Sequence, residues 1–312
     1  MKRIIVIMTI ILVSLIIAGC GSTTKDEAQA DLTIYTSIYP IQYAVERIGG
    51  DTVHAESVYP PGVDAHSYEP TTKKMTSIAS SDAFIYMGAG MEGFAETAAD
   101  ALKSQNVNLV ELGKHKELFD SENEEHNEED HKDDGHHHGD HNPHIWLDPQ
   151  RMISMADLVK QALIDLNPDK KELYTDNFEA LKKDLSALDS SFKKTMQPKQ
   201  NKKILVSHAA YGYWEERYGI EQIAIRGITS SDEPSQKELT SIIKQAKEND
   251  VHYILFEQNS SDRISNIMQE QLNANVEYIH NLEVLTEDDI NQHENYLSLM
   301  EHNLHVLDKV TK

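Results

Sequence analysis

The chain has 312 residues, and 52 acidic residues against 29 basic ones give it a formal net charge of −23 at pH 7. A chain this acidic is not expected to bind nucleic acid or an anionic membrane surface through its own charge, and it should attract cations. About 280 residues follow the first 31, which is too many for one compact core and predicts two domains.

The amino terminus predicts a secretory signal over residues 1–19. A basic start is followed by fifteen apolar residues, and the small residues before Cys20 resemble a bacterial lipobox. We expect cleavage before Cys20, lipidation of its thiol, and a flexible tether over residues 20–31. The alternative, an uncleaved membrane span, needs ~20 apolar residues. Because the sequence has 1 cysteine, an intrachain disulfide and a thiolate metal site are excluded. These features predict an extracytoplasmic protein held to the outer face of the cell membrane by lipid alone.

Residues 32–166 are predicted to form an N-terminal α/β lobe. Runs rich in β-branched and aromatic residues alternate with helical patterns, and this alternation is typical of parallel sheets. The predicted strands are residues 32–38, 53–59, 83–88 and 107–112. The predicted helices are residues 41–50, 72–81, 91–105 and 149–165.

Within this lobe, residues 120–141 are almost entirely polar. They combine a run of carboxylates with six histidines: His126, His131, His136, His137, His138 and His141. Such a composition cannot bury enough apolar surface to offset chain entropy, so it predicts a disordered surface loop. Imidazole suits zinc, copper and nickel, and carboxylate accepts most divalent cations. We therefore expect a secondary metal-binding loop; a solvated acidic loop and a purification tag are the alternatives.

A long helix is predicted next, from Asp169 to about Met196, and residues 167–198 are expected to link the two lobes. Its apolar residues recur at alternating spacings of three and four and so form one stripe: Phe178, Leu181, Leu185, Leu188 and Phe192.

Residues 199–312 are predicted to form a C-terminal α/β lobe. Its expected strands are residues 204–209, 220–227, 251–258 and 276–282, with helical patterns at 235–250 and 295–310. The predicted fold class is therefore α/β, with two lobes that each hold a mainly parallel four-stranded sheet with flanking helices, joined by one long helix. No glycine-rich phosphate loop and no hydrolase signature occurs in the sequence.

Three histidines lie where open parallel sheets place ligands, beyond the carboxyl ends of strands or at turns. His66 lies in PPGVDAHSYEP, His144 in NPHIWLDP, and His208 ends the strand ILVSH. Each alone is about as well explained as an ordinary surface or core histidine. Together, and with a histidine-rich segment beside His144, they favour metal ligation.

Over residues 32–312 the chain resembles the zinc-binding lipoproteins of the cluster A-I solute-binding family, the extracytoplasmic receptors of bacterial ABC importers for zinc and manganese. The resemblance depends on the three histidine segments, on RGITSSDEPS at 226–235 and on the acidic, histidine-rich loop. It implies two lobes bridged by a rigid helix, with a metal ion between the lobes.

The resemblance also implies the ligands. Its three histidines fall on His66, His144 and His208, and its acidic ligand points to Glu283 in HNLEVLTEDD, with Glu257 or a water as alternatives. Asp64 and Glu69 could orient His66, because a metal-bound imidazole usually donates its other N–H to an acceptor. They are equally well explained as turn and helix-cap residues.

The ligand types favour Zn²⁺. Manganese-binding members of the family have a glutamate where His208 stands, whereas three imidazoles and one carboxylate suit tetrahedral zinc. The expected function is capture of Zn²⁺ for an ABC permease with its cytoplasmic ATPase, by a monomer from a Gram-positive source. A manganese or iron receptor, an adhesin-type lipoprotein and a zinc hydrolase are the alternatives, the last requiring an open coordination position and a general base.

Overall fold

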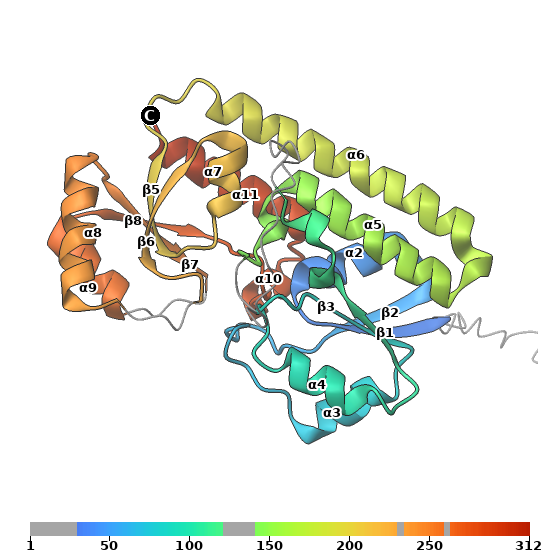
Figure 1. The fold of residues 1–312 in the computed structure, drawn as a ribbon. Coiled ribbons are helices and arrows are strands. Elements are labelled where there is room, and N and C mark those ends of the chain that lie inside the picture. Colours follow the sequence, from blue (N-terminus) through green and yellow to red (C-terminus); the bar gives the residue numbers. More distant parts are fainter. Residues whose placement is uncertain (1–29, 121–140, 230–233, 259–262) are drawn as a thin grey trace, which may run out of the picture.

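The computed structural model describes residues 30–120, 141–229, 234–258 and 263–312, and it confirms the predicted α/β fold with two parallel sheets (Figure 1). The first sheet has the strand order β2-β1-β3-β4 and the second the equivalent order β6-β5-β7-β8, and every pairing is parallel. The strands are β1 (Leu32–Thr36), β2 (Val53–Ser57), β3 (Ala83–Tyr86), β4 (Asn108–Glu111), β5 (Lys203–His208), β6 (Glu221–Arg226), β7 (Tyr253–Glu257) and β8 (Asn275–Ile279). All eight fall within one residue of the runs predicted from the sequence or inside them.

In both sheets the strand order reverses between the first and third strands, β1 and β3 in one lobe and β5 and β7 in the other. Side chains and loops at the carboxyl ends of such a strand pair lie next to each other, and this is where open α/β sheets bind ligands. His208 ends β5 and Glu257 ends β7, so the second sheet brings these two residues together at that position.

Helices cover the sheets and fill the space between the lobes. Those of the first lobe are α2 (Tyr39–Gly49), α3 (Thr72–Ala79) and α4 (Ala95–Leu102). Those that follow α6 in the chain are α7 (Gly212–Tyr218), α8 (Gln236–Glu248), α9 (Arg263–Leu272), α10 (Glu287–Asn291) and α11 (Tyr296–Val310), of which α10 lies against α2 and β2. The sequence patterns named α8 and α11 but not α7, α9 or α10.

Two long helices, α5 (Pro149–Leu166) and α6 (Lys171–Met196), form a hairpin along one side of the molecule, and α6 extends over both lobes in Figure 1. Helix α6 packs on α5 and α2 and also on α7 and α11 of the second lobe. The predicted stripe is its buried face: Phe178, Leu181, Leu185, Leu188 and Phe192 are at most 5% exposed. One hydrophobic cluster therefore includes residues of both lobes, while a second, smaller cluster lies between β5–β8 and the helices α8 and α9.

Charged side chains also join the second lobe to this hairpin. The Arg217 Nε of α7 lies 2.6 Å from Asp189 Oδ1 of α6 and 3.2 Å from Asp148 Oδ1, which caps α5. Arg151 of α5 donates to Glu216 at 2.9 Å. Burial raises the pKa of Asp148 to about 6, although Arg217 and Arg151 oppose this shift. Removing one partner from such a buried group leaves a charge without compensation, so these contacts favour one arrangement of α5, α6 and α7.

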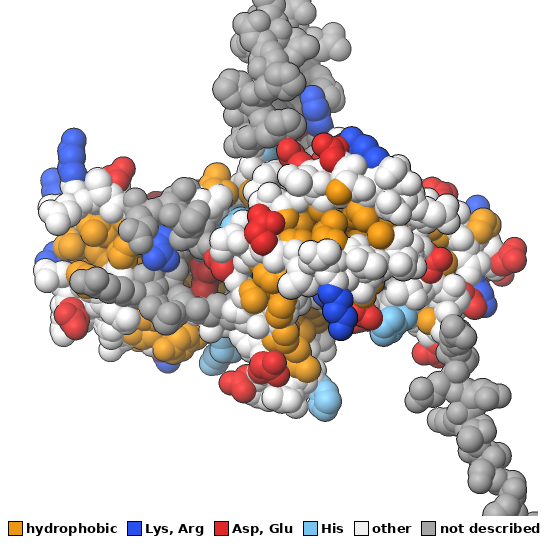
Figure 2. Space-filling view, turned by 90° about the horizontal axis from the view of Figure 1, so that it is seen from below, with side chains coloured by type: hydrophobic (Ala, Val, Ile, Leu, Met, Phe, Trp, Pro, Cys, Tyr) orange, Lys and Arg blue, Asp and Glu red, His pale blue; other side chains and the backbone are white. Residues whose placement is uncertain are grey.

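Among the described residues no helix is long and apolar enough to cross a membrane. The face shown in Figure 2 carries acidic and basic side chains spread around apolar ones rather than gathered in one basic patch, in agreement with the acidic composition.

Leu185→Ala should lower the unfolding free energy of the metal-free protein by about 2–5 kcal/mol, because Leu185 is fully buried and the truncation leaves a cavity under α6. Leu173→Ala is the matched control on the same helix: this side chain is 39% exposed, and its loss should cost about 0.5 kcal/mol or less. Denaturant unfolding of both variants measures the difference. Equal losses would show that α6 is not anchored through its apolar stripe.

Candidate metal centre

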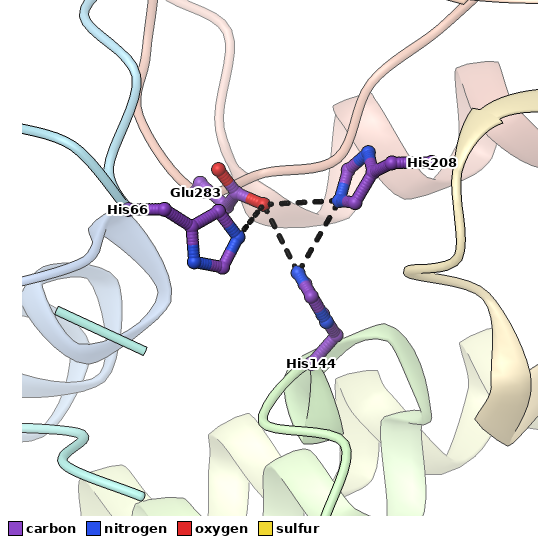
Figure 3. A group of neighbouring side chains, drawn as sticks. All are labelled: His66, His144, His208 and Glu283. Carbon is purple, nitrogen blue, oxygen red and sulfur yellow. Dashed lines mark hydrogen bonds and ion pairs between the residues drawn. The ribbon is translucent and has the colours of Figure 1, made fainter. Parts of the chain in front are cut away.

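Four side chains converge between the two lobes: His66, His144, His208 and Glu283 (Figure 3). One ligand atom from each lies within 4.8 Å of the others. Glu283 Oε1 lies 3.2 Å from His144 Nε2, 3.6 Å from His208 Nε2 and 3.7 Å from His66 Nε2. The Nε2 atoms of His144 and His208 are 3.4 Å apart. The structure thus brings together the three histidines and the carboxylate that the sequence predicted.

Each of the four comes from a different connection or strand end. His66 lies in the loop between β2 and α3, and His208 is the last residue of β5. His144 precedes a short 3₁₀ turn, Ile145–Leu147, that leads into α5. Glu283 lies in the loop after β8. Their side chains are at most 6% exposed, so the site is closed to bulk solvent.

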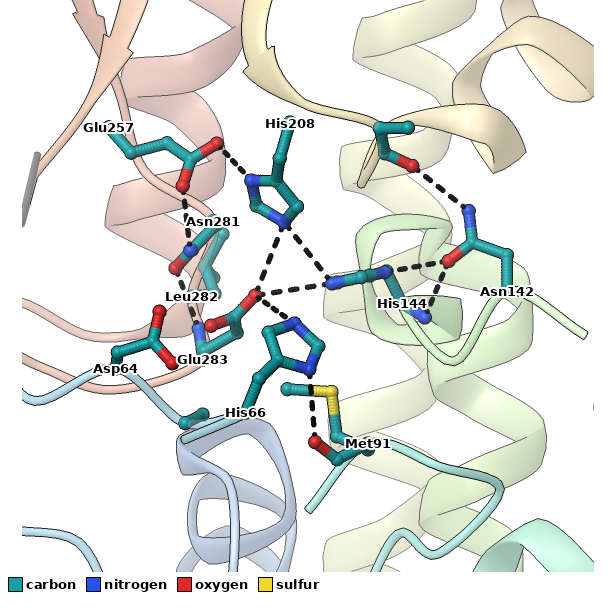
Figure 4. Close-up of polar contacts among 12 residues, drawn as sticks. Asp64, His66, Met91, Asn142, His144, His208, Glu257, Asn281, Leu282 and Glu283 are labelled. Carbon is teal, nitrogen blue, oxygen red and sulfur yellow. Dashed lines mark hydrogen bonds and ion pairs between the residues drawn. The ribbon is translucent and has the colours of Figure 1, made fainter. Parts of the chain in front are cut away.

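The other ring nitrogen of each histidine has its own hydrogen-bond acceptor (Figure 4). His66 Nδ1 lies 3.0 Å from the Met91 carbonyl oxygen and His144 Nδ1 lies 2.6 Å from Asn142 Oδ1. His208 Nδ1 lies 2.6 Å from Glu257 Oε1. A neutral imidazole that donates from Nδ1 presents an unprotonated Nε2 to a metal ion, the arrangement typical of metal-binding histidines. All three Nε2 atoms point toward Glu283 Oε1.

These contacts bear on two questions that the sequence left open. Glu257, considered as the fourth ligand, lies behind His208 and contacts its Nδ1. Asp64 is a turn residue, because its Oδ1 accepts from the N–H and the hydroxyl of Ser67, while Glu69 is exposed and the Met91 carbonyl takes the position proposed for these carboxylates. The sequence analysis did not identify Asn142 and Met91 as hydrogen-bond acceptors of the histidines. The position of Asn142, two residues before His144, could have indicated its role, whereas the backbone carbonyl of Met91 leaves no signal in the sequence.

The electrostatics of the site favour a bound cation. Burial lowers the pKa of His144 to about 4, although Glu283 opposes the shift. Burial also disfavours the charged form of His208, but Glu257 and Glu283 outweigh it and raise the pKa of this residue to about 10. Burial alone would raise the pKa of Glu283, yet the histidines around it hold it well below its usual range. Two buried carboxylates therefore keep positive charge in the centre.

The backbone at Glu283 is strained. Leu282 is fully buried and has φ = +64°, a left-handed conformation that is unfavourable for a residue with a large side chain. It is maintained by hydrogen bonds on both sides: Leu282 N–H donates to His280 Nδ1 at 2.9 Å, and Glu283 N–H donates to Asn281 Oδ1 at 3.1 Å. This turn directs the Glu283 carboxylate toward the three imidazoles.

The donor set matches the coordination preferences of zinc. A tetrahedral Zn²⁺ with bonds of ~2.0–2.1 Å has its ligand atoms about 3.3 Å apart. The four separations given above are 3.2, 3.4, 3.6 and 3.7 Å. The other two separations, from His66 to the other two imidazoles, lie within 4.8 Å. Inward movement of the side chains would bring all six close to the tetrahedral value for three nitrogens and one oxygen.

The remaining predicted sites lie almost entirely outside the described residues. Cys20 and five histidines of the acidic segment fall there: His126, His131, His136, His137 and His138. His141 is described, and its ring stacks on Phe119 with 5.3 Å between the centroids.

Comparison with known proteins gives a consistent result. The family model described as "Zinc-uptake complex component A periplasmic" matches residues 34–310. The zinc-binding lipoprotein AdcA of Streptococcus pneumoniae is 32% identical over 300 residues, which make up 96% of this chain but only 59% of that protein. The high-affinity zinc uptake system protein ZnuA of Bacillus subtilis is 30% identical over 297 residues, 94% of this chain and 93% of that protein.

A solved structure agrees in fold. The Zn(II)-bound ZnuA-like domain of Streptococcus pneumoniae AdcA is 30% identical with a TM-score of 0.72, and the match covers 90% of this chain and 98% of that one. Because the family model spans most of the sequence and both lobes, this chain belongs to the ZnuA family of zinc-uptake components.

Proposed function

We propose that this protein is an extracytoplasmic receptor that captures Zn²⁺ and delivers it to the permease of an ABC importer, which a cytoplasmic ATPase drives. The observation that carries the proposal is the convergence of three imidazole nitrogens and one carboxylate oxygen, all within 4.8 Å of one another, in a closed site. The family description and the names of the relatives, which concern zinc uptake and zinc binding, support it.

The proposed ligands are His66, His144, His208 and Glu283. A water in the fourth position is disfavoured, because Glu283 Oε1 already faces all three histidines. Four protein donors leave a tetrahedral ion no open position, which argues against the hydrolase alternative. Three nitrogens argue against manganese, which prefers oxygen donors and higher coordination.

We infer the attachment of the protein to the membrane from residues 1–31 of the sequence. Removal of residues 1–19 would leave a lipid on Cys20 and a tether over residues 20–31 outside the cell membrane, as expected for a Gram-positive source. The proposed division of the folded part is an N-terminal lobe at 32–166, a linking helix at 167–198 and a C-terminal lobe at 199–312. We propose a monomer that meets the membrane only through its lipid.

Competition against a chelator of known zinc affinity, with manganese and iron(II) in parallel, tests the metal. The expected result is one tightly bound zinc ion per protein chain and much weaker binding of manganese and iron. A preference for manganese or iron would contradict the proposal. Growth of a deletion strain in zinc-depleted medium tests transport. If the deletion strain adheres less well to surfaces but grows normally in zinc-depleted medium, the adhesin alternative is favoured.

Deleting residues 121–140 should remove additional, weaker zinc ions and leave the tight one in place. We propose these weaker sites from the sequence of the segment, since its histidines and carboxylates are zinc donors and its composition offers no packed framework to hold them. Counting zinc per chain with and without the segment measures this. A deletion variant that loses its tight zinc would show that the primary site is misplaced, and an unchanged zinc count would show that the segment is only a spacer.

A further inference from the structure

Asn281 occupies a central position beside the candidate metal centre without facing the four proposed ligand atoms. It lies in the loop after β8, two residues before Glu283, and is 6% exposed (Figure 4). Its side-chain amide, its backbone N–H and its carbonyl oxygen all make hydrogen bonds in the structure.

The amide of Asn281 has only one orientation that suits its neighbours. Oδ1 accepts from Glu283 N–H at 3.1 Å and from Gln258 Nε2 at 2.8 Å. Nδ2 donates to Glu257 Oε2 at 3.1 Å. A flipped amide would place nitrogen against two donors and oxygen against a carboxylate. The Asn281 N–H donates to Gln258 Oε1 at 3.1 Å, so the same glutamine amide holds both the side chain and the backbone of Asn281.

These bonds reach three of the four proposed ligands by separate routes, two through the side chain of Asn281 and one through its backbone carbonyl, which a substitution affects only indirectly. Through Glu257, Asn281 is connected to His208 Nδ1, since the other oxygen of that carboxylate lies 2.6 Å from this nitrogen. Through its own Oδ1 it fixes the backbone of Glu283.

The third route leads to His144. The carbonyl oxygen of Asn281 accepts from Trp146 Nε1 at 2.9 Å. Trp146 is fully buried, lies two residues after His144 and packs against its ring, with 5.2 Å between the ring centroids. His66 has no such connection, because its Nδ1 contacts the Met91 carbonyl in the first lobe.

We propose that Asn281 is a positioning residue that sets the mutual spacing of His144, His208 and Glu283 and so holds three of the zinc ligands in place before the ion arrives. This inference rests on the proposed function of the site. Asparagine is required rather than aspartate or leucine. Aspartate would place a second carboxylate against Glu257, and leucine would remove the hydrogen bonds that Asn281 makes to Glu257 Oε2 and to the Glu283 N–H.

Zinc affinity, cobalt(II) spectra and metal-free thermal stability of Asn281→Leu test the proposal. Outer partners of metal ligands typically contribute 10–100-fold to affinity, and we expect a loss of about this size. The visible band of bound Co²⁺, which reports on tetrahedral geometry, should weaken or shift. Asn177→Leu is the control: this half-buried amide on α6 donates to the Ile48 carbonyl, far from the centre, and its loss should alter stability alone.

Gln258→Ala provides a second test if Asn281→Leu fails to fold. This half-buried side chain makes one hydrogen bond to the Asn281 amide and one to the Asn281 backbone N–H. Its removal should therefore change affinity and the Co²⁺ band in the same direction but by less. Wild-type affinity and spectrum in the folded Asn281→Leu variant, or in Gln258→Ala, would overturn the inference. Absence of tight zinc binding by the wild-type protein would instead overturn the proposed function itself.

Discussion

His208→Ala should weaken zinc binding by more than about 100-fold, beyond the range typical of residues that act only through a ligand. The imidazole is nearly fully buried, and its Nε2 lies among Glu283 Oε1 and His144 Nε2 at distances of 3.6 and 3.4 Å. Alanine leaves a coordination position that no other described side chain near the centre can fill, because Glu257 lies on the far side of the ring. Competition with a zinc chelator measures the loss.

The control for this variant is His252→Ala. His252 immediately precedes β7, its side chain is 55% exposed, and its Nε2 lies 3.1 Å from Asp250 at the edge of the second lobe. Zinc affinity of this variant should match that of the wild type. If both substitutions weaken binding equally, the loss reflects general destabilisation and the assignment of His208 as a ligand fails.

His208→Glu should lower the ratio of zinc to manganese affinity, because it exchanges a nitrogen donor for a hard oxygen. The structure adds a complication that the sequence did not reveal. The new carboxylate would be buried between Glu257 and Glu283, and like charges at such short range disfavour the ionised form that a metal needs. The single variant should therefore bind every divalent ion more weakly than its ligand set alone suggests.

The double variant His208→Glu with Glu257→Gln separates these two effects. Glutamine keeps the size of Glu257 but removes its charge, so manganese affinity should recover while the zinc preference stays reduced. Titration calorimetry of wild type, single and double variants with both ions gives the ratios. An unchanged ratio in the double variant would refute the argument from ligand type.

The sequence predicted the sheets well because the central strands β1, β3, β5 and β7 are largely buried and so appear as short runs of β-branched and aromatic residues, as in ILVSH and YILFE. The edge strands are only half-buried, but they carry enough β-branched residues to be predicted too. Helices α7 and α9, of seven and ten residues, were not named from the sequence. The four residues at the centre were identified because three end strands or follow turns and the resemblance supplied Glu283. The role of Asn281 depends on contacts with residues distant in sequence, and the role of Met91 depends on a carbonyl oxygen, so neither had a local signal.

The four side chains of the centre come from separate parts of the chain, and His66 lies in one lobe while His208 and Glu283 lie in the other. No fragment of the polypeptide contains the site, and an unfolded chain has no equivalent arrangement for the ion to select. Loading with metal is therefore postponed until both lobes have formed. From then on an ion at this centre stabilises only the native state, and free zinc at 1,000 times its dissociation constant would add about 4.1 kcal/mol to stability. In a compartment with proteases, scarcity of zinc would thus shorten the lifetime of the protein, and abundance would prolong it.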